Sequence, residues 1–490
     1  MVPARALIVV PPFLKYAAGP LLGPALLVAA ARAAGHDADT LDLSIRWIRE
    51  QMPVDVAMPA SVVVGDHDKP GAMLSTMQRE TFVPILRAHL TDFELLDGAD
   101  PHLSMTCSHE AANIAVERMI HSPMGVWIRK QLEGSAEPHV FGVSVLFSGQ
   151  VLPGLVASAI AKELWPEVRV VWGGAHVTAL QDRIAEDARY GRFVDAFVFG
   201  YAERTFVELL DAAASGASLP KECVQPGAKF AHRALDNGTH APVFQDLDRY
   251  GLPRLTLPAQ MSRGCSYARC EFCTYPTIEG EYRPLAQAVV EPVVIEAAVL
   301  GANVAFKDSL IVPNRLIALA DQIAGRVRWS GCTKLHRSLD ANTLRRLAEG
   351  GCDTLEIGLE TIDPEQQVII EKKQSKALFV RVLDAAANAG VGLVVNYMTG
   401  FPGQNAKAAA DELAWVREQL EQRQGLRAIV EHNDFQLERL SPMARSPRVH
   451  GIEVTRQWPW ASVLGWRVAV ARTTRLRMAD EVARVCALPL

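Results

Sequence analysis

The chain contains little cysteine for its length. It has 8 cysteines among 490 residues, which is too few for a secreted fold held together by disulfides. Five of them are scattered, and three lie within one short segment. This distribution is typical of a reduced protein with a single thiolate site. We therefore expect a cytoplasmic location.

Long apolar runs and an excess of basic charge are also missing. The most apolar N-terminal stretch, residues 6–31, is interrupted by Lys15 and by several prolines and glycines. It predicts neither a signal-peptide core nor a membrane span. The net charge of −5 gives no basic footprint for nucleic acid. We expect no membrane span and no nucleic-acid partner, and the length favours at least two domains.

The first part of the chain alternates between short apolar strands and helices. Such strand–helix–strand units with brief connections predict a parallel sheet with helices on both faces. We assign residues 1–216 to a doubly wound, Rossmann-like α/β domain, with an insertion at about 50–137 where the pattern is weak. The expected strands are 6–10, 36–44, 139–147, 168–174 and 195–200, and the expected helices are 23–35, 152–165 and 203–216.

A second α/β series follows a segment without periodicity. Residues 217–257 are richer in Pro, Gly and Asn, which favours a linker. From 258 to 440 about six strand–helix units follow one another, which predicts a partial (β/α)6 barrel of the TIM-like type. Residues 441–490 form a C-terminal extension.

The three clustered cysteines are Cys265, Cys270 and Cys273, spaced C-x4-C-x2-C. Three close thiolates can hold three corners of a cubane iron–sulfur cluster and leave the fourth iron open. The segment follows a strand-like stretch at the start of the barrel series, and active sites of barrels form at such strand ends. Two alternatives stay open. One is a zinc ion bound by the trio with Cys332 or His336, and the other is a catalytic dithiol at Cys270 and Cys273.

The segment RGCSYARCEFC resembles the signature of the radical S-adenosylmethionine superfamily, whose usual spacing is C-x3-C-x2-C, with one extra residue here. The resemblance covers about 259–440 and implies that the trio binds a [4Fe-4S] cluster. It also implies contacts to S-adenosylmethionine. The residues that match such positions are Phe272 in C-E-F-C, Asp308 in AFKDSL, Glu360 in EIGLETID and Gly400 in NYMTGFPGQ.

Beside such a barrel, the N-terminal domain resembles the cobalamin-binding domain of the cobalamin-dependent subgroup. GGAHVT and FGYAERTFVELL resemble two of its segments, although Tyr201 replaces an acid of the usual pattern. The D-x-H-x-x-G motif that supplies an axial histidine elsewhere is missing, and we expect His176 to form a hydrogen bond within its loop. The small residues expected to lie under a corrin ring are Ser148, Gly149, Gly173, Gly174 and Gly200.

The resemblance implies a [4Fe-4S] cluster, S-adenosylmethionine and cobalamin as cofactors. The leading expectation is a C-methyltransferase that acts, through a 5′-deoxyadenosyl radical, on an unactivated carbon of a natural-product or peptide substrate. An electron donor such as flavodoxin or ferredoxin would be a partner. The alternative within this class is a rearrangement, cyclisation or ring contraction without methyl transfer. The alternative from another class is a zinc-stabilised binding or scaffold protein. No catalytic residue is assigned.

Overall fold

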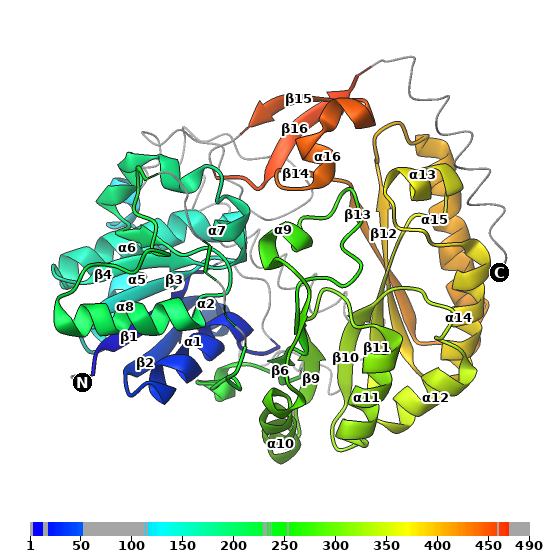
Figure 1. The fold of residues 1–490 in the computed structure, drawn as a ribbon, viewed down its shortest axis with the longest axis horizontal. Helices are drawn as coiled ribbons and strands as arrows, with labels where there is room; N and C mark the ends of the chain where they lie inside the picture. The colour runs from blue at the N-terminus through cyan, green and yellow to red at the C-terminus, as the bar shows by residue number, and fades with distance from the viewer. Residues whose placement is uncertain are drawn as a thin grey trace. The chain divides into compact units, whose positions relative to one another are not determined.

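The computed structural model describes residues 3–12, 18–51, 113, 116–228, 233–234, 236, 238–251, 254–457 and 460–469. The chain forms two compact units (Figure 1). The first contains the described residues up to Leu255 together with residues 460–462. The second contains Thr256–Gln457 and the described residues from Val463 onward.

The first unit is built on a five-stranded parallel sheet in the order β2-β1-β3-β4-β5. Its central strands are apolar, and β1 and β3 are almost entirely buried. The order reverses between β1 and β3, which is the arrangement of a doubly wound sheet. The predicted fold of this domain is confirmed. The strands are β1 (Arg5–Val10), β2 (Asp37–Asp42), β3 (Val140–Ser144), β4 (Arg169–Gly173) and β5 (Ala196–Phe197).

Alternate side chains of the sheet enter two separate cores. Leu7 and Val9 of β1 pack with residues of α5 (Pro123–Glu133) and α6 (Val151–Leu164). Ala6 and Ile8 pack with residues of α1 (Leu22–Ala33) and α8 (Glu203–Ser215). Because neighbouring strand residues point to opposite faces, the helices cover both faces of the sheet. The shorter elements are α2 (Leu43–Gln51), η1 (Ser148–Gln150), α7 (Ala175–Ala179), η2 (Ile184–Glu186), η3 (Ala188–Arg192) and η4 (Leu247–Arg249).

The segment that we expected to be a linker belongs to the first unit as far as Leu255. Val224 pairs with Phe197 in an antiparallel bridge, and Ala234 pairs with Gly200 in a parallel one. Cys223, Val224 and Ala234 are buried. The segment lacks periodicity because it packs through isolated contacts rather than through a helix or a strand.

The second unit contains six parallel strands in the order β13-β12-β11-β10-β9-β6, so that each strand lies beside its neighbours in the barrel series. The sheet is curved, and α11, α12, α14 and α15 lie along its outer side (Figure 1). The predicted partial (β/α)6 barrel is confirmed. The strands are β6 (Thr256–Ala259), β9 (Asn303–Phe306), β10 (Trp329–Thr333), β11 (Cys352–Glu360), β12 (Gly392–Thr399) and β13 (Ala428–Asp434). The helices are α10 (Glu291–Leu300), α11 (Pro313–Ile323), α12 (Ala341–Glu349), α13 (Pro364–Ile369), α14 (Lys376–Ala389) and α15 (Ala406–Glu421).

A three-stranded antiparallel sheet follows the barrel, in the order β14-β16-β15. Its apolar side packs against Phe401, Phe435 and Ile370 of the barrel unit. The described part of the C-terminal extension therefore has its own structure. Its elements are β14 (Leu437–Glu438), α16 (Pro442–Arg445), η6 (Pro447–His450), β15 (Ile452–Gln457) and β16 (Val463–Val468).

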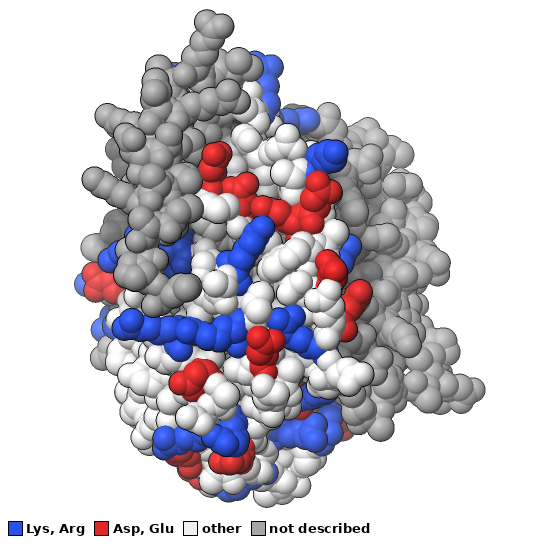
Figure 2. All heavy atoms as spheres, turned by 90° about the vertical axis from the view of Figure 1, so that its right-hand side faces the viewer, with Lys and Arg blue, Asp and Glu red and all other residues white. Residues whose placement is uncertain are grey.

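The outer surface of the second unit carries charges of both signs side by side (Figure 2). Ion pairs join neighbouring helices there, for example Arg346 of α12 to Asp321 of α11. Among the described residues, no helix is long and apolar enough to cross a bilayer.

Candidate cofactor site

The cysteine segment forms a loop between β7 (Ser262–Arg263) and α9 (Tyr275–Glu279), directly after the first barrel strand. Asp308 secures the start of this loop. Its buried carboxylate accepts hydrogen bonds from Met261 N at 3.0 Å and from Ser262 Oγ at 2.6 Å. Burial raises the pKa of Asp308 to about 6, against the opposing effect of these hydrogen bonds. In this structure Asp308 fixes the loop, and its contact with S-adenosylmethionine stays a prediction.

The segment between Cys265 and Cys270 contains an unusual backbone conformation. Ala268 has φ of 45°, and it lies at the exposed tip of the loop. A residue with a side chain adopts this left-handed region at a cost. This conformation lies in the stretch between Cys265 and Cys270, which is one residue longer than the usual spacing.

The three thiols are half-buried and free of disulfides. Burial raises the pKa of Cys270, and it raises the pKa of Cys273 to about 12. All three cysteines lie on the loop between β7 and α9. Three soft donors on one loop are the ligand set that an iron–sulfur cubane takes, with deprotonation driven by the metal. The residues present fit the cluster.

The zinc alternative requires ligands that converge on one ion, with sulfurs about 2.3 Å from the metal. Among the described residues, no three His, Cys, Asp or Glu side chains form a group that could hold a metal ion. A cubane differs because its cysteines bind separate irons. Cys332 is half-buried on β10, and His336 is exposed and accepts a hydrogen bond from Ser338 N.

Glu360 ends β11 and is paired with a lysine. Its Oε1 lies 2.9 Å from Lys372 Nζ, and the two side chains are 9% and 14% exposed. Glu360 has φ of 67°, and the register of β11 against β12 shifts between Gly358 and Glu360. Such a bulge redirects a side chain at the end of a strand. A Cβ at Gly358 would lie 2.4 Å from Glu360 Oε1, so the glycine makes room for the pair.

Two lysines lie against aromatic rings of the cysteine loop. Lys334 Nζ is 3.3 Å from the centroid of the Tyr267 ring, and Lys372 Nζ is 5.7 Å from that of Phe272. The Tyr267 hydroxyl donates to the Glu371 carbonyl at 2.5 Å. Burial lowers the pKa of Lys334 to about 8. The loop after β10 and the loop after α13 therefore both contact the cysteine loop.

Gly400 follows β12 in a left-handed conformation, with φ of 82°. Its N–H and that of Phe401 both donate to Gln404 Oε1, at 2.8 and 3.2 Å. The ring of Phe401 lies 6.0 Å from that of Phe272. The structure thus brings Phe272 close to the segment that carries Gly400. The role of both residues toward adenine stays a prediction.

In the first unit, the turn after β3 carries Ser148 and Gly149. Gln150, which is completely buried, organises this turn. Its Oε1 accepts from Leu146 N at 2.9 Å, and its Nε2 donates to the Pro11 carbonyl at 2.8 Å. Gln150 therefore joins the end of β3 to the end of β1, on either side of the point where the strand order reverses.

The three remaining glycines have different surroundings. A Cβ at Gly174 would lie 2.4 Å from the Val145 carbonyl oxygen, and one at Gly200 would lie 2.7 Å from the Ala234 carbonyl oxygen. Both residues also have positive φ, so the chain itself requires glycine there. A Cβ at Gly173 would meet only the Val198 carbonyl, at 3.4 Å. The structure therefore leaves more room for a side chain at Gly173, the last residue of β4, than at Gly174 or Gly200.

His176 is buried, and its Nε2 lies 2.8 Å from the Trp460 carbonyl. Burial lowers its pKa to about 4, against the effect of this contact. The neutral ring therefore donates its Nε2–H to a carbonyl far away in the sequence. His176 forms a hydrogen bond, as predicted, but the partner does not belong to its own loop. Trp460 itself is part of the core of the first unit.

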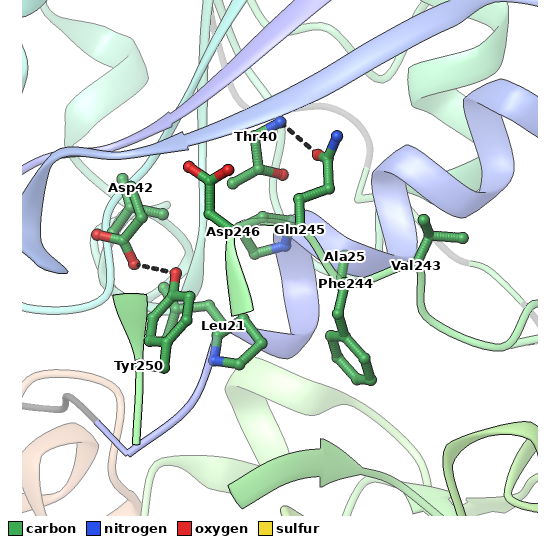
Figure 3. Close-up of a pocket in the computed structure, with 12 residues that line it drawn as sticks. Leu21, Ala25, Thr40, Asp42, Val243, Phe244, Gln245, Asp246 and Tyr250 are labelled. Atoms are coloured by element: carbon green, nitrogen blue, oxygen red, sulfur yellow. Dashed lines mark hydrogen bonds between the residues drawn. The ribbon is translucent and has the colours of Figure 1, made fainter. Parts of the chain in front are cut away.

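A small cavity of about 10 Å³ lies near the ends of β1 and β2 (Figure 3). Asp42 is buried beside it, and its Oδ2 accepts from the Tyr250 hydroxyl at 2.9 Å. Gln245 Oε1 accepts from Thr40 N at 2.7 Å. These contacts fasten the segment after α8 to β2.

Sequence reasoning missed Lys334, Lys372 and Gln150. The two lysines carry no spacing signal, since each stands alone in a loop. Gln150 carries one weak signal, because a polar residue stands there at the start of an otherwise apolar helix. The residues predicted from the sequence divide between the two units. The predicted cobalamin contacts belong to the first unit and are Ser148, Gly149, Gly173, Gly174 and Gly200. The predicted contacts to the cluster and to S-adenosylmethionine belong to the second unit and are Cys265, Cys270, Phe272, Cys273, Asp308, Glu360 and Gly400.

Residues 259–416 match the model of the radical SAM superfamily, and residues 128–210 match that of the B12 binding domain. The chain thus contains a B12-binding domain ahead of a radical SAM domain. These are the two domains that the sequence predicted, and they imply the predicted cofactors, which are a [4Fe-4S] cluster, S-adenosylmethionine and cobalamin.

Two known protein sequences are similar to parts of the chain. A methyltransferase from Pyrococcus horikoshii, described as uncharacterized, is 24% identical over 296 residues, which are 55% of this chain and 61% of that protein. The anaerobic magnesium-protoporphyrin IX monomethyl ester cyclase from Rubrivivax gelatinosus is 23% identical over 287 residues, 53% of this chain and 50% of that protein. The chain therefore matches less than two thirds of the length of each.

Two solved structures share the fold. The radical S-adenosylmethionine methyltransferase TsrM from Kitasatospora setae, with cobalamin and a [4Fe-4S] cluster bound, has a TM-score of 0.61 at 14% identity, covering 100% of this chain and 89% of that one. The cobalamin-dependent enzyme OxsB, with aqua-cobalamin and S-adenosylmethionine bound, has a TM-score of 0.63 at 12% identity, covering 98% and 66%.

Proposed function

We propose that the enzyme transfers a methyl group to an unactivated carbon of a small-molecule or peptide substrate. The observation that carries this proposal is the presence of a B12-binding domain and a radical SAM domain on one chain. When bound, the cluster with S-adenosylmethionine supplies one-electron cleavage of a C–S bond, and cobalamin supplies a methyl carrier. The similarity to a methyltransferase sequence supports the methyl-transfer outcome.

The residues of the second unit would hold the cluster and orient S-adenosylmethionine. The thiols of Cys265, Cys270 and Cys273 would bind three irons. The Glu360 carboxylate, fixed by Lys372 at 2.9 Å, would accept hydrogen bonds from the ribose or amino group. The rings of Phe272 and Phe401, whose centroids are 6.0 Å apart, would offer an apolar surface to the adenine.

The residues of the first unit would hold cobalamin along the carboxyl ends of β3 and β4. Gln150 keeps the turn at Ser148 and Gly149 in place. A Cβ at Gly173, at the next strand end, would meet one ordinary contact. With His176 engaged by the Trp460 carbonyl, this residue would not bind cobalt. The domain would therefore hold the corrin through shape rather than through that histidine.

The substrate, the electron donor and the location belong to the same proposal. TsrM has been solved with tryptophan, which supports tryptophan as a first small-molecule probe. A flavodoxin or ferredoxin would supply electrons, and this requirement favours the cytoplasm.

The test uses full-length protein reconstituted anaerobically with iron, sulfide and hydroxocobalamin. It is given a low-potential reductant, S-adenosylmethionine with a trideuterated methyl group, and tryptophan or a peptide library. Mass spectrometry should find products in which a CD3 group has replaced a hydrogen, together with S-adenosylhomocysteine and 5′-deoxyadenosine. Protein that retains the cluster but neither retains cobalamin nor forms S-adenosylhomocysteine would contradict methyl transfer.

The second candidate is a cyclisation or rearrangement without methyl transfer. The similarity to a cyclase, at 23% identity, favours it. It predicts 5′-deoxyadenosine formation and a product without the CD3 label. The same experiment therefore separates the two candidates.

A further inference from the structure

We infer that Lys372 and Lys334 are positioning residues that set the charge around the cysteine loop and thereby favour one-electron reduction of its cluster. This inference rests on the proposed binding of a cluster by Cys265, Cys270 and Cys273. It assigns a function to two lysines that the sequence motifs do not contain.

Lys372 is held in place from three sides. Its Nζ is 2.9 Å from Glu360 Oε1 and 5.7 Å from the centroid of the Phe272 ring. The Tyr267 hydroxyl donates to the carbonyls of Glu371 and Lys372, at 2.5 and 3.4 Å. Glu371 has φ of 49°, so this turn adopts a left-handed conformation without glycine. A costly backbone conformation that is tied to the cysteine loop points to a fixed position for the ammonium group.

Lys334 approaches the loop from another strand. It directly follows β10, and its Nζ lies 3.3 Å from the centroid of the Tyr267 ring. Tyr267 is the second residue after Cys265. An ammonium group over an aromatic face is stabilised by the ring quadrupole, more strongly when water is excluded. The loop therefore uses two of its own aromatic rings, Tyr267 and Phe272, to hold two ammonium groups.

The groups that lie against the two aromatic rings of the loop are two lysines and one carboxylate. Lys372 Nζ lies near the Phe272 ring and beside Glu360 Oε1, and Lys334 Nζ lies against the Tyr267 ring. Glu360 can neutralise one of the two ammonium groups, so these three groups together carry a positive charge. Charges at short range in a partly buried site interact by energies that change an equilibrium severalfold.

One-electron reduction adds an electron from an external low-potential donor to the bound cluster, and no bond to a cysteine forms or breaks. The electron makes the site more negative. Two fixed ammonium groups stabilise that added charge, so the loss of either should disfavour reduction. The loss of the Glu360 carboxylate should favour it.

The experiment is a redox titration with dithionite and mediators, followed by electron paramagnetic resonance. It uses full-length reconstituted protein at neutral pH without S-adenosylmethionine. Lys372→Met and Lys334→Met should each shift the reduction equilibrium about tenfold toward the oxidised form, which is 59 mV for one electron. Glu360→Gln should shift it in the opposite direction. The matched control is Lys373→Met, because Lys373 is the next residue and is exposed.

Several outcomes would overturn the inference. One is a potential for Lys372→Met and Lys334→Met equal to that of Lys373→Met, and another is a shift of Glu360→Gln in the same direction as Lys372→Met. If Lys372→Met loses iron, Lys372→Arg must keep the wild-type potential, and Lys334→Met and Glu360→Gln must still shift in opposite directions. A wild-type protein that binds no cluster would instead contradict the proposed function, and iron analysis distinguishes this case.

Discussion

Lys372 Nζ and Glu360 Oε1 lie 2.9 Å apart in a space that exists because position 358 is a glycine. A Cβ at Gly358 would lie 2.4 Å from the Glu360 oxygen and 2.6 Å from the Lys372 nitrogen. Both side chains are mostly buried, so neither can move far without exposing or burying an unpaired charge. The backbone of β11 is thereby coupled to the proposed S-adenosylmethionine site.

Gly358→Ala should therefore weaken S-adenosylmethionine binding by about tenfold, which corresponds to about 1.4 kcal/mol. The added methyl group would displace the Glu360–Lys372 pair, while the cysteine loop would keep its ligands. Equilibrium dialysis with labelled S-adenosylmethionine and parallel iron analysis measure the two effects separately. The control is Gly331→Ala in the neighbouring strand, where the Cβ would meet only side-chain atoms, with the Ile311 Cδ1 at 3.1 Å. Unchanged binding in Gly358→Ala would show that the pair does not orient the cofactor.

The cysteine assignments predict that Cys265→Ala, Cys270→Ala and Cys273→Ala each lose the cluster. Anaerobically reconstituted wild-type protein should hold about four irons and four sulfides per chain. Cys265→Ala should lose iron as severely as Cys270→Ala, because both cysteines are assigned as ligands of the same cluster despite the longer spacing between them. Cys332→Ala, at a half-buried position on β10, is the control and should retain the cluster. A Cys265→Ala protein with full iron content would show that another cysteine is the third ligand.

Much of the fold could be predicted from the sequence because local periodicity carries it. Apolar strands such as β1 and β3 are buried on both faces, and the helices between them carry one apolar face. The segment 217–257 was different. Its contacts, such as Val224 with Phe197 and Tyr250 with Asp42, join residues far apart in the chain. Contacts between residues far apart in the chain leave no local sequence pattern. The sequence therefore could not predict that the first unit extends to Leu255.

The candidate site also contains residues that the sequence could predict and residues that it could not. Cys265, Cys270 and Cys273 have a spacing that only a few chemistries require, so the sequence singles them out. Lys334 and Lys372 belong to the site because two separate loops fold back onto Tyr267 and Phe272. The glycines of the first unit were all predicted from the sequence, but the sequence could not tell their roles apart. Gly173 and Gly174 look equivalent in the sequence. The structure shows that a side chain could be placed at Gly173, whereas the backbone requires glycine at position 174.

That difference yields a prediction for cobalamin. Gly173→Trp should leave the first unit folded and abolish retention of hydroxocobalamin through gel filtration, since bulk at the end of β4 would occupy the space of the corrin. Cluster content should stay normal because the cysteines belong to the other unit. Absorption spectra of the eluted protein measure both cofactors. Retention of cobalamin by a folded Gly173→Trp protein would show that the corrin does not bind at this strand end.

Gly174→Trp should behave differently and serves as the contrast. Its side chain would collide with the Val145 carbonyl at 2.4 Å, and its φ of 104° disfavours any residue but glycine. We expect this variant to lower the melting temperature of the first unit or to prevent its folding. Circular dichroism before cofactor loading distinguishes a lost fold from a lost ligand contact.

The last prediction concerns the stability of the first unit and follows from the buried Asp42. Burial raises its pKa from 3.8 to about 6, although Ile45 N and the Tyr250 hydroxyl donate to it and Arg46 lies nearby. Because the folded pKa exceeds the unfolded one, this group stabilises the fold below about pH 4, and the contribution is lost as the pH rises through about 6. The full difference is about 3 kcal/mol. Asp42→Asn should remove it, whereas Asp246→Asn, at a position 40% exposed, should leave it in place. Hydrogen exchange of the amides of β1 and β2, measured at several pH values and corrected for intrinsic rates, reports the free energy of opening. An equal pH dependence in wild type and Asp42→Asn would mean that Asp42 stays ionised in the folded unit.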